Sequence, residues 1–105
     1  MSLNDRERDF EARYVHDQEL KFRIAARRNK LIGLWAAEKL GKSGDEAEAY
    51  AQEMIRADFE KPGRDNVFEK LRTDFDAAGV AQSDHQIRRC LAEFLATAET
   101  QIHHA

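Results

Sequence analysis

The sequence of 105 residues contains one cysteine, one proline and no long run of apolar residues. A single cysteine, Cys90, excludes an internal disulfide and a zinc site built from several cysteines. No stretch approaches the roughly 20 consecutive apolar residues that a membrane-spanning helix needs. Residues 1–8 also lack the apolar stretch of a secretory signal. We therefore expect a cytoplasmic protein that does not insert into the membrane.

The sequence also lacks any run in which apolar and polar residues alternate, which is the pattern of a half-buried strand. The apolar residues instead recur at helical spacing, between segments that contain glycine or Pro62. This pattern predicts an all-α protein with helices at about 19–40, 45–60, 66–78 and 84–102. Short loops between four helices favour a compact, mostly antiparallel four-helix bundle over residues 19–105.

Several residues have the chemistry of helix ends. Gly41 and Gly79 follow apolar helical patterns and suit the left-handed conformation that terminates a helix. Asp45 is a good N-cap for the second helix. Ser83 and Gln86 have the spacing of a capping box at the start of the fourth helix.

Each predicted helix has an apolar stripe that we expect to face the core. We interpret Cys90 as a buried small hydrophobe and Trp35 as a core residue, although an exposed tryptophan could also anchor a partner. The stripes comprise Leu20, Ile24, Leu31 and Trp35; Ala47, Tyr50, Ala51, Met54, Ile55 and Phe59; Val67, Phe68, Leu71, Phe75 and Ala78; and Ile87, Cys90, Leu91, Phe94, Leu95, Ala98 and Ile102.

Residues 1–18, here called the arm, have a different pattern. Leu3, Phe10 and Tyr14 fall on one narrow helical stripe among alternating charges, and Asn4 with Glu7 can form a capping box. So thin a stripe cannot hold a helix against its own core, so we expect the arm to be mobile and partly disordered in the free protein. The stripe is typical of a helix that binds in a partner's groove. The alternative is a tail that only aids solubility.

Charge is unevenly distributed along the chain. Residues 1–30 carry eight Lys or Arg and six Asp or Glu, whereas residues 31–105 carry nine and fourteen. The basic run 21–30 includes Arg23, Arg27, Arg28 and Lys30, which are candidates for weak contacts with phosphate or a nucleotide. The same residues suit a solvated helix face, because their stems cover apolar surface. An RNA- or nucleotide-binding module is therefore our alternative function, although the acidic remainder disfavours general nucleic-acid binding.

Catalytic and metal-binding patterns are poorly supported. His16 lies beside Asp17 and His85 beside Asp84, but neighbours on a helix point about 100° apart and do not form a dyad. The terminal pair His103–His104 needs further ligands to bind a metal. We therefore expect no catalytic residue, no metal site and no cofactor.

Several segments together resemble a known family. The resemblance rests on Ala26 to Glu38 (ARRNKLIGLWAAE), Leu40–Gly41, Gly44 to Ala47, Ala49 to Ala51, Ala57 to Glu60 and, upstream, Asp5 to Glu7, Phe10–Glu11 and His16–Asp17. The sequence resembles the zeta subunit family of alpha-proteobacterial F1Fo-ATP synthase inhibitors, long catalogued as a domain of unknown function. The likeness spans nearly the whole chain, and the last helix shares mainly the pattern.

The resemblance implies a four-helix bundle with a mobile N-terminal inhibitory region, here about Ser2 to Glu19. By this resemblance the region would block ATP hydrolysis by the F1 sector, at a catalytic interface between alpha and beta subunits near gamma. Leu3, Phe10 and Tyr14 would then be apolar anchors, and the arm's charged residues would pair with the enzyme. The implied partner-binding residues are Leu3, Asp5, Arg6, Glu7, Arg8, Phe10, Arg13 and Tyr14.

The resemblance further implies an enzyme regulator, not an enzyme. Its partners would be the alpha, beta and gamma subunits, and the family is also associated with weak adenine-nucleotide binding. The protein would be cytoplasmic and peripheral to the inner membrane through the synthase, and we expect a monomer when it is free. A structural homo-oligomer, in which the first helix pairs with its copy, is a third hypothesis.

Overall fold

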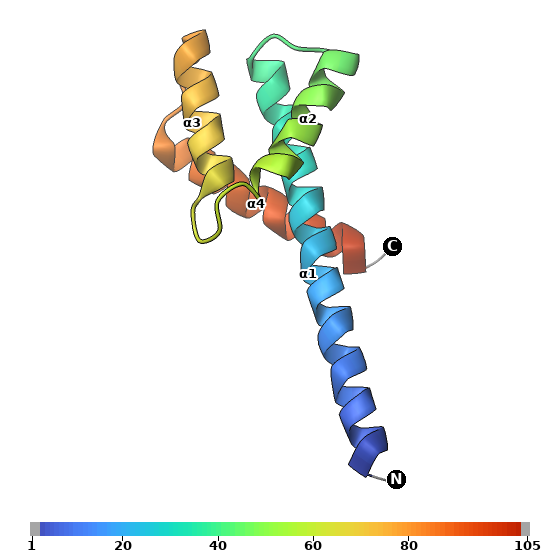
Figure 1. Ribbon diagram of the computed structural model, residues 1–105. Helices are drawn as coiled ribbons and strands as arrows, with labels where there is room; N and C mark the ends of the chain where they lie inside the picture. Colours follow the sequence, from blue (N-terminus) through green and yellow to red (C-terminus); the bar gives the residue numbers. More distant parts are fainter. Residues whose placement is uncertain (1–2, 104–105) are drawn as a thin grey trace.

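The computed structural model describes the backbone of residues 3–103 and the side chains of residues 15–103. Over that range the chain forms four α-helices: α1 (Leu3–Lys39), α2 (Asp45–Ala57), α3 (Asn66–Ala78) and α4 (Asp84–His103) (Figure 1). The all-α, four-helix prediction is confirmed. The molecule is elongated, with extents of 62 × 28 × 23 Å, because α1 projects far beyond the other helices.

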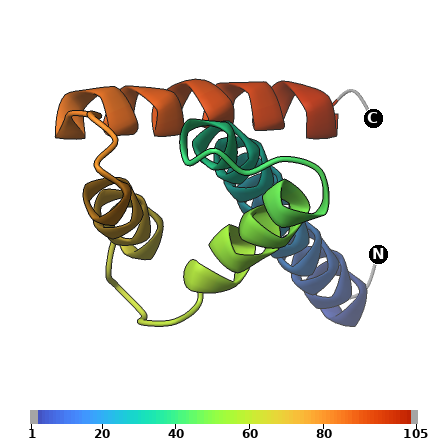
Figure 2. The same ribbon diagram turned by 90° about the horizontal axis from the view of Figure 1, so that it is seen from above.

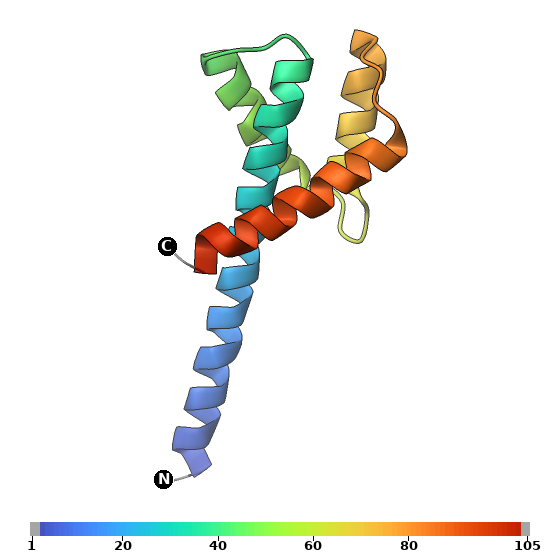
Figure 3. The ribbon, with the colours of Figure 1, turned by 180° about the vertical axis from the view of Figure 1, so that it is seen from behind.

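Helix α1 organises the bundle. Its C-terminal half packs against α2 on one side and α4 on the other, and α3 packs on α2 and α4. We expected a mostly antiparallel bundle, but α4 runs across α1 (Figures 2 and 3). Helix α4 contacts two helices along its length: Ile87 packs into the core shared with α3, whereas Gln101 accepts a hydrogen bond from Arg27 of α1.

The core lies where the four helices meet. Trp35 stands edge-on to Phe75, with ring centroids 5.7 Å apart, so the prediction that this tryptophan belongs to the core holds. The buried core residues are Ile32, Ala36 and Ala37 of α1, Tyr50 and Met54 of α2, Val67, Leu71 and Phe75 of α3, and Ile87 of α4.

Helices α1 and α2 approach closely at Gly33. A Cβ atom built on Gly33 would lie 2.7 Å from the Cα of Ala51, closer than real Cβ contacts allow. Glycine at this position therefore lets the two backbones pack against one another, and the nearby Ala36, Ala37 and Ala51 are fully buried.

The predicted helix ends at Gly79 and Ser83 are confirmed. Gly79 is left-handed (φ 69°), its N–H donates to the Asp76 carbonyl, and the Val80 N–H donates to the Phe75 carbonyl at 2.9 Å. These are the two bonds of a Schellman motif. At α4, the Ser83 N–H donates to Gln86 Oε1 at 2.8 Å and the Gln86 N–H donates to Ser83 Oγ at 3.1 Å.

Helix α2 departs from the prediction at both ends. It ends at Ala57, not near Glu60, because the next residues form a turn in which the N–H groups of Phe59 and Glu60 bond three residues back. Phe59 is consequently 56% exposed, so the prediction that it faces the core is wrong. At the start, Gly44 occupies the N-cap position and Asp45 is the first helical residue. Ala78, expected to face the core on α3, is also exposed.

The backbone of α1 shows no break between the arm and the bundle. The helix begins at Leu3, two residues before the start that the Asn4–Glu7 box suggested, and continues to Lys39. The arm boundary at residue 18 is therefore not a helix end. The boundary stays a prediction of where contacts with the other helices stop stabilising α1.

Candidate functional site

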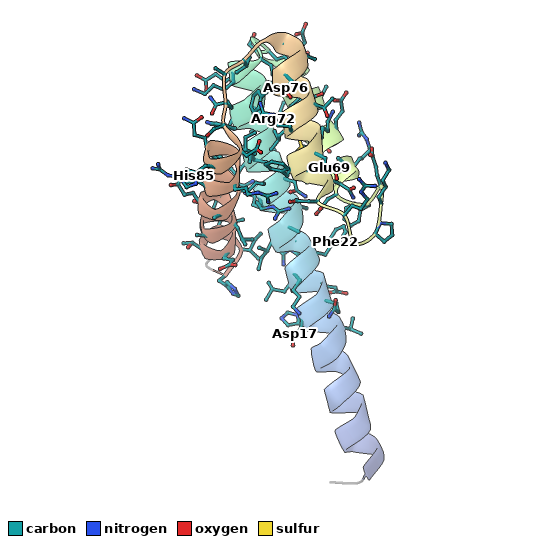
Figure 4. All side chains as sticks on the ribbon, turned by 90° about the vertical axis from the view of Figure 1, so that its left-hand side faces the viewer. Asp17, Phe22, Glu69, Arg72, Asp76 and His85 are labelled. Carbon is teal, nitrogen blue, oxygen red and sulfur yellow. The ribbon has the colours of Figure 1, made fainter. Side chains whose placement is uncertain are left out.

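The most unusual surface of the structure is the projecting part of α1. The side chains of residues 15–19 are exposed, and half-buried positions begin at Leu20 and Ile24, where the bundle starts to cover the helix. Figure 4 shows Asp17 on the uncovered part and Phe22 at the level where the other helices begin. The bundle thus acts as a base from which a straight helix extends.

The predicted anchors lie on this projection. The side chains of the eight arm residues named above lie outside the described residues, as do those of the Asn4–Glu7 box. Their backbones belong to the continuous helix α1. At 100° per residue, Leu3, Phe10 and Tyr14 fall within about 40° of one another around its axis.

An aromatic contact marks the root of the projection. Phe22 of α1 stacks on Phe59 from the turn after α2, with ring centroids 5.4 Å apart and an interplanar angle of 29°. A shallow hollow lies beside this contact, lined by Gln18, Glu19, Phe22 and Arg23. We predicted a core position for Phe59 and no role for Phe22, and no local sequence pattern indicates that the two rings meet.

The four basic candidates for phosphate binding do not converge. The Arg27 Nε–H donates to Gln101 Oε1 at 2.6 Å, whereas Arg28 donates to Asn29 Oδ1 and lies 3.8 Å from Asp58 Oδ2. Arg23 is exposed and Lys30 is half-buried. Two of the four cations therefore point at different protein partners, and the nucleotide-binding hypothesis receives no support from their placement.

A hollow between α2 and α3 is lined by charged side chains that pair with one another. The Tyr50 hydroxyl donates to Asp74 Oδ2 at 2.8 Å, and Lys70 pairs with Asp74 at 3.0 Å and with Glu53 at 3.5 Å. Burial and this hydrogen bond raise the pKa of the Tyr50 phenol well above its ordinary value. The hydroxyl therefore stays protonated and joins α2 to α3.

The histidines and the cysteine form no reactive arrangement in the described part of the chain. His16, Asp17, Asp84 and His85 are exposed, and Figure 4 shows Asp17 on α1 far from His85 on α4. Burial raises the pKa of the half-buried Cys90 thiol, which keeps it protonated at neutral pH. Between residues 15 and 103, no three His, Cys, Asp or Glu side chains gather as metal ligands.

Among the described residues no helix has the length and apolar character needed to cross a membrane.

Comparison with known proteins relates this architecture to an inhibitor family. The family model described as ATPase inhibitor subunit zeta matches residues 1–101. A solved structure described as the solution NMR structure of a protein is 44% identical, with a TM-score of 0.69; the match covers 79% of this chain and 94% of that chain. A search of curated proteins finds no match. Because the family model spans the projecting helix and the bundle as far as residue 101 of α4, the chain belongs to the ATPase inhibitor subunit zeta family.

Proposed function

We propose that this protein inhibits the F1 sector of ATP synthase by inserting its arm, residues 1–18, as a helix at a catalytic interface between alpha and beta subunits near gamma. The observation that carries the proposal is the projecting helix, which the bundle leaves uncovered. The chain also belongs to an ATPase inhibitor family. The protein is then a regulator, and it needs no active site of its own.

The dimensions of the helix suit this role. Eighteen helical residues extend about 27 Å at 1.5 Å per residue, enough to reach deep between two subunits. The molecule is 28 and 23 Å wide across its long axis, so the bundle is too wide to follow the helix between two subunits. It would therefore stay outside as a stop that sets how far the arm enters.

The anchors offset the cost of ordering the arm. Fixing a backbone residue costs roughly 1–2 kcal/mol, so any part of the arm that is frayed in the free protein must be stabilised by burial in the enzyme. Leu3, Phe10 and Tyr14 supply apolar area on one face. The neighbouring charges, among them Arg6, Arg8 and Arg13, supply pairing partners at the rim.

The location follows from the partner. Binding to F1 places the protein in the cytoplasm, peripheral to the inner membrane. We propose that the free protein is a monomer, because the core residues are already buried within one chain.

The test measures ATP hydrolysis by purified F1 with the full chain and with the variants Phe10→Asp and Tyr14→Asp. We expect inhibition by the native chain. Each variant should lose at least tenfold in potency, because burying a carboxylate in an apolar groove costs free energy. A matched control, Ala96→Asp on the exposed face of α4, should inhibit like the native chain. Unchanged potency of both arm variants would refute insertion of this stripe, and a native chain without inhibition would refute the function.

A further inference from the structure

The large hydrophobic side chains that are more than half exposed between residues 15 and 103 all lie on the projecting part of α1 or at its root. Val15 is 53% exposed, Phe22 is 54% and Phe59 is 56%. Val15 and Phe22 are seven residues apart and therefore share one side of α1. Such an apolar patch with charged neighbours is typical of an interaction surface.

The turn that carries Phe59 is hydrogen-bonded to two buried side-chain amides. Asp58, next to Phe59, accepts a hydrogen bond from Nδ2 of the fully buried Asn29 at 3.0 Å. The buried Asn66 side chain donates to the carbonyls of Asp58 and Lys61, at 3.4 and 3.1 Å. Two buried amides thus fix the turn that carries Phe59. An aromatic pair that is ordered before binding loses little entropy when a partner covers it.

The position of the pair identifies the surface that would cover it. Phe22 lies four residues beyond the arm's last residue, a rise of about 6 Å along the same helix. An enzyme that encloses the arm up to residue 18 must therefore bring its own surface to the hollow lined by Gln18, Glu19, Phe22 and Arg23. The charges of Glu19 and Arg23 border the apolar rings, as polar rims border the central contacts of protein interfaces.

We propose that Phe22 and Phe59 form a second docking site, which receives an apolar side chain of the F1 sector at the rim of the groove that takes the arm. This inference rests on the proposed function for the identity of the partner. In this proposal the arm blocks rotation. The aromatic pair lies outside the inhibitory region, and its contact with F1 slows the release of the inhibitor.

The test measures binding of the full-length protein to immobilised F1, separately from inhibition of hydrolysis. The double variant Phe22→Gln/Phe59→Gln should bind at least tenfold more weakly, mainly through faster dissociation, and should still inhibit completely at saturation. The matched control Phe22→Tyr/Phe59→Tyr keeps both rings and should bind within about twofold of the native chain. Thermal unfolding of every variant verifies the fold, and both single Gln variants are measured as well.

The outcomes separate this proposal from the proposed function. Binding of the double Gln variant within twofold of the native chain would overturn the docking site and leave the arm mechanism standing. Weak binding of that variant, combined with unchanged inhibitory potency of both Phe10→Asp and Tyr14→Asp, would support the docking site and overturn the arm mechanism. A native chain that does not bind F1 would overturn both.

Discussion

The side-chain amide of Asn29 donates a hydrogen bond to the carboxylate of Asp58, with 3.0 Å between Nδ2 and Oδ2. Its oxygen accepts from Nε and Nη2 of Arg28 at 3.0 and 2.9 Å, so the fully buried amide satisfies both of its ends. This contact joins the C-terminal half of α1 to the turn after α2.

Asn29→Ala should destabilise the protein by about 1–3 kcal/mol, because Asp58 loses its buried donor and a small cavity remains. Urea unfolding monitored by circular dichroism measures the loss. Gln18→Ala changes an exposed amide on the same helix and should cost less than about 0.5 kcal/mol. Equal stabilities for the two variants would show that the Asn29–Asp58 contact contributes nothing.

Gly33→Ala should destabilise the protein although alanine favours a helix by about 1 kcal/mol over glycine. The added Cβ would lie 2.7 Å from the Cα of Ala51, and this neighbour is backbone and cannot rotate away. Overpacking of this kind costs roughly 1–3 kcal/mol. Gln52→Ala on the exposed face of α2 is the control. An increase in the free energy of unfolding for Gly33→Ala would contradict the close approach.

Tyr50→Phe should remove about 1.5–3 kcal/mol at neutral pH, since the hydroxyl donates to the charged Asp74. The raised pKa also predicts a pH effect. The folded state holds the phenolic proton more tightly than the unfolded state, so this stabilisation is complete below about pH 10 and falls as the pH rises further.

Urea unfolding between about pH 9 and 11 tests that effect. The free energy of unfolding should decline with pH more steeply for the native chain than for Tyr50→Phe, in which no phenol titrates at position 50. Parallel declines would mean that Tyr50 ionises equally easily in both states.

Ser83→Ala should cost about 1 kcal/mol, because the N–H of Gln86 loses the hydroxyl that caps α4. The control is Ser43→Ala, which removes an exposed hydroxyl from the loop before α2 and should leave the urea midpoint unchanged. If both serine variants unfolded at the native midpoint, the capping box would have no energetic role.

Helix positions and most helix ends were predictable because their causes are local. Gly79 needs only its own backbone freedom and the preceding turn, and Ser83 with Gln86 needs only the first turn of α4. The stripe of α3 likewise follows from spacing alone, and Val67, Leu71 and Phe75 are buried as predicted. The end of α2 was mispredicted, because Asn66, eight residues beyond Asp58, holds the intervening turn.

The sequence by itself determined that the chain is helical, where its apolar stripes lie and that residues 1–18 have too little apolar surface to join the core. The tertiary structure decided that Phe59 turns outward onto Phe22, that Asn29 is buried against Asp58 and that α4 crosses α1. These features depend on contacts between residues distant in the chain. Periodicity reports only which face of a helix is apolar, whereas the packing of the other helices decides which part of that face is covered.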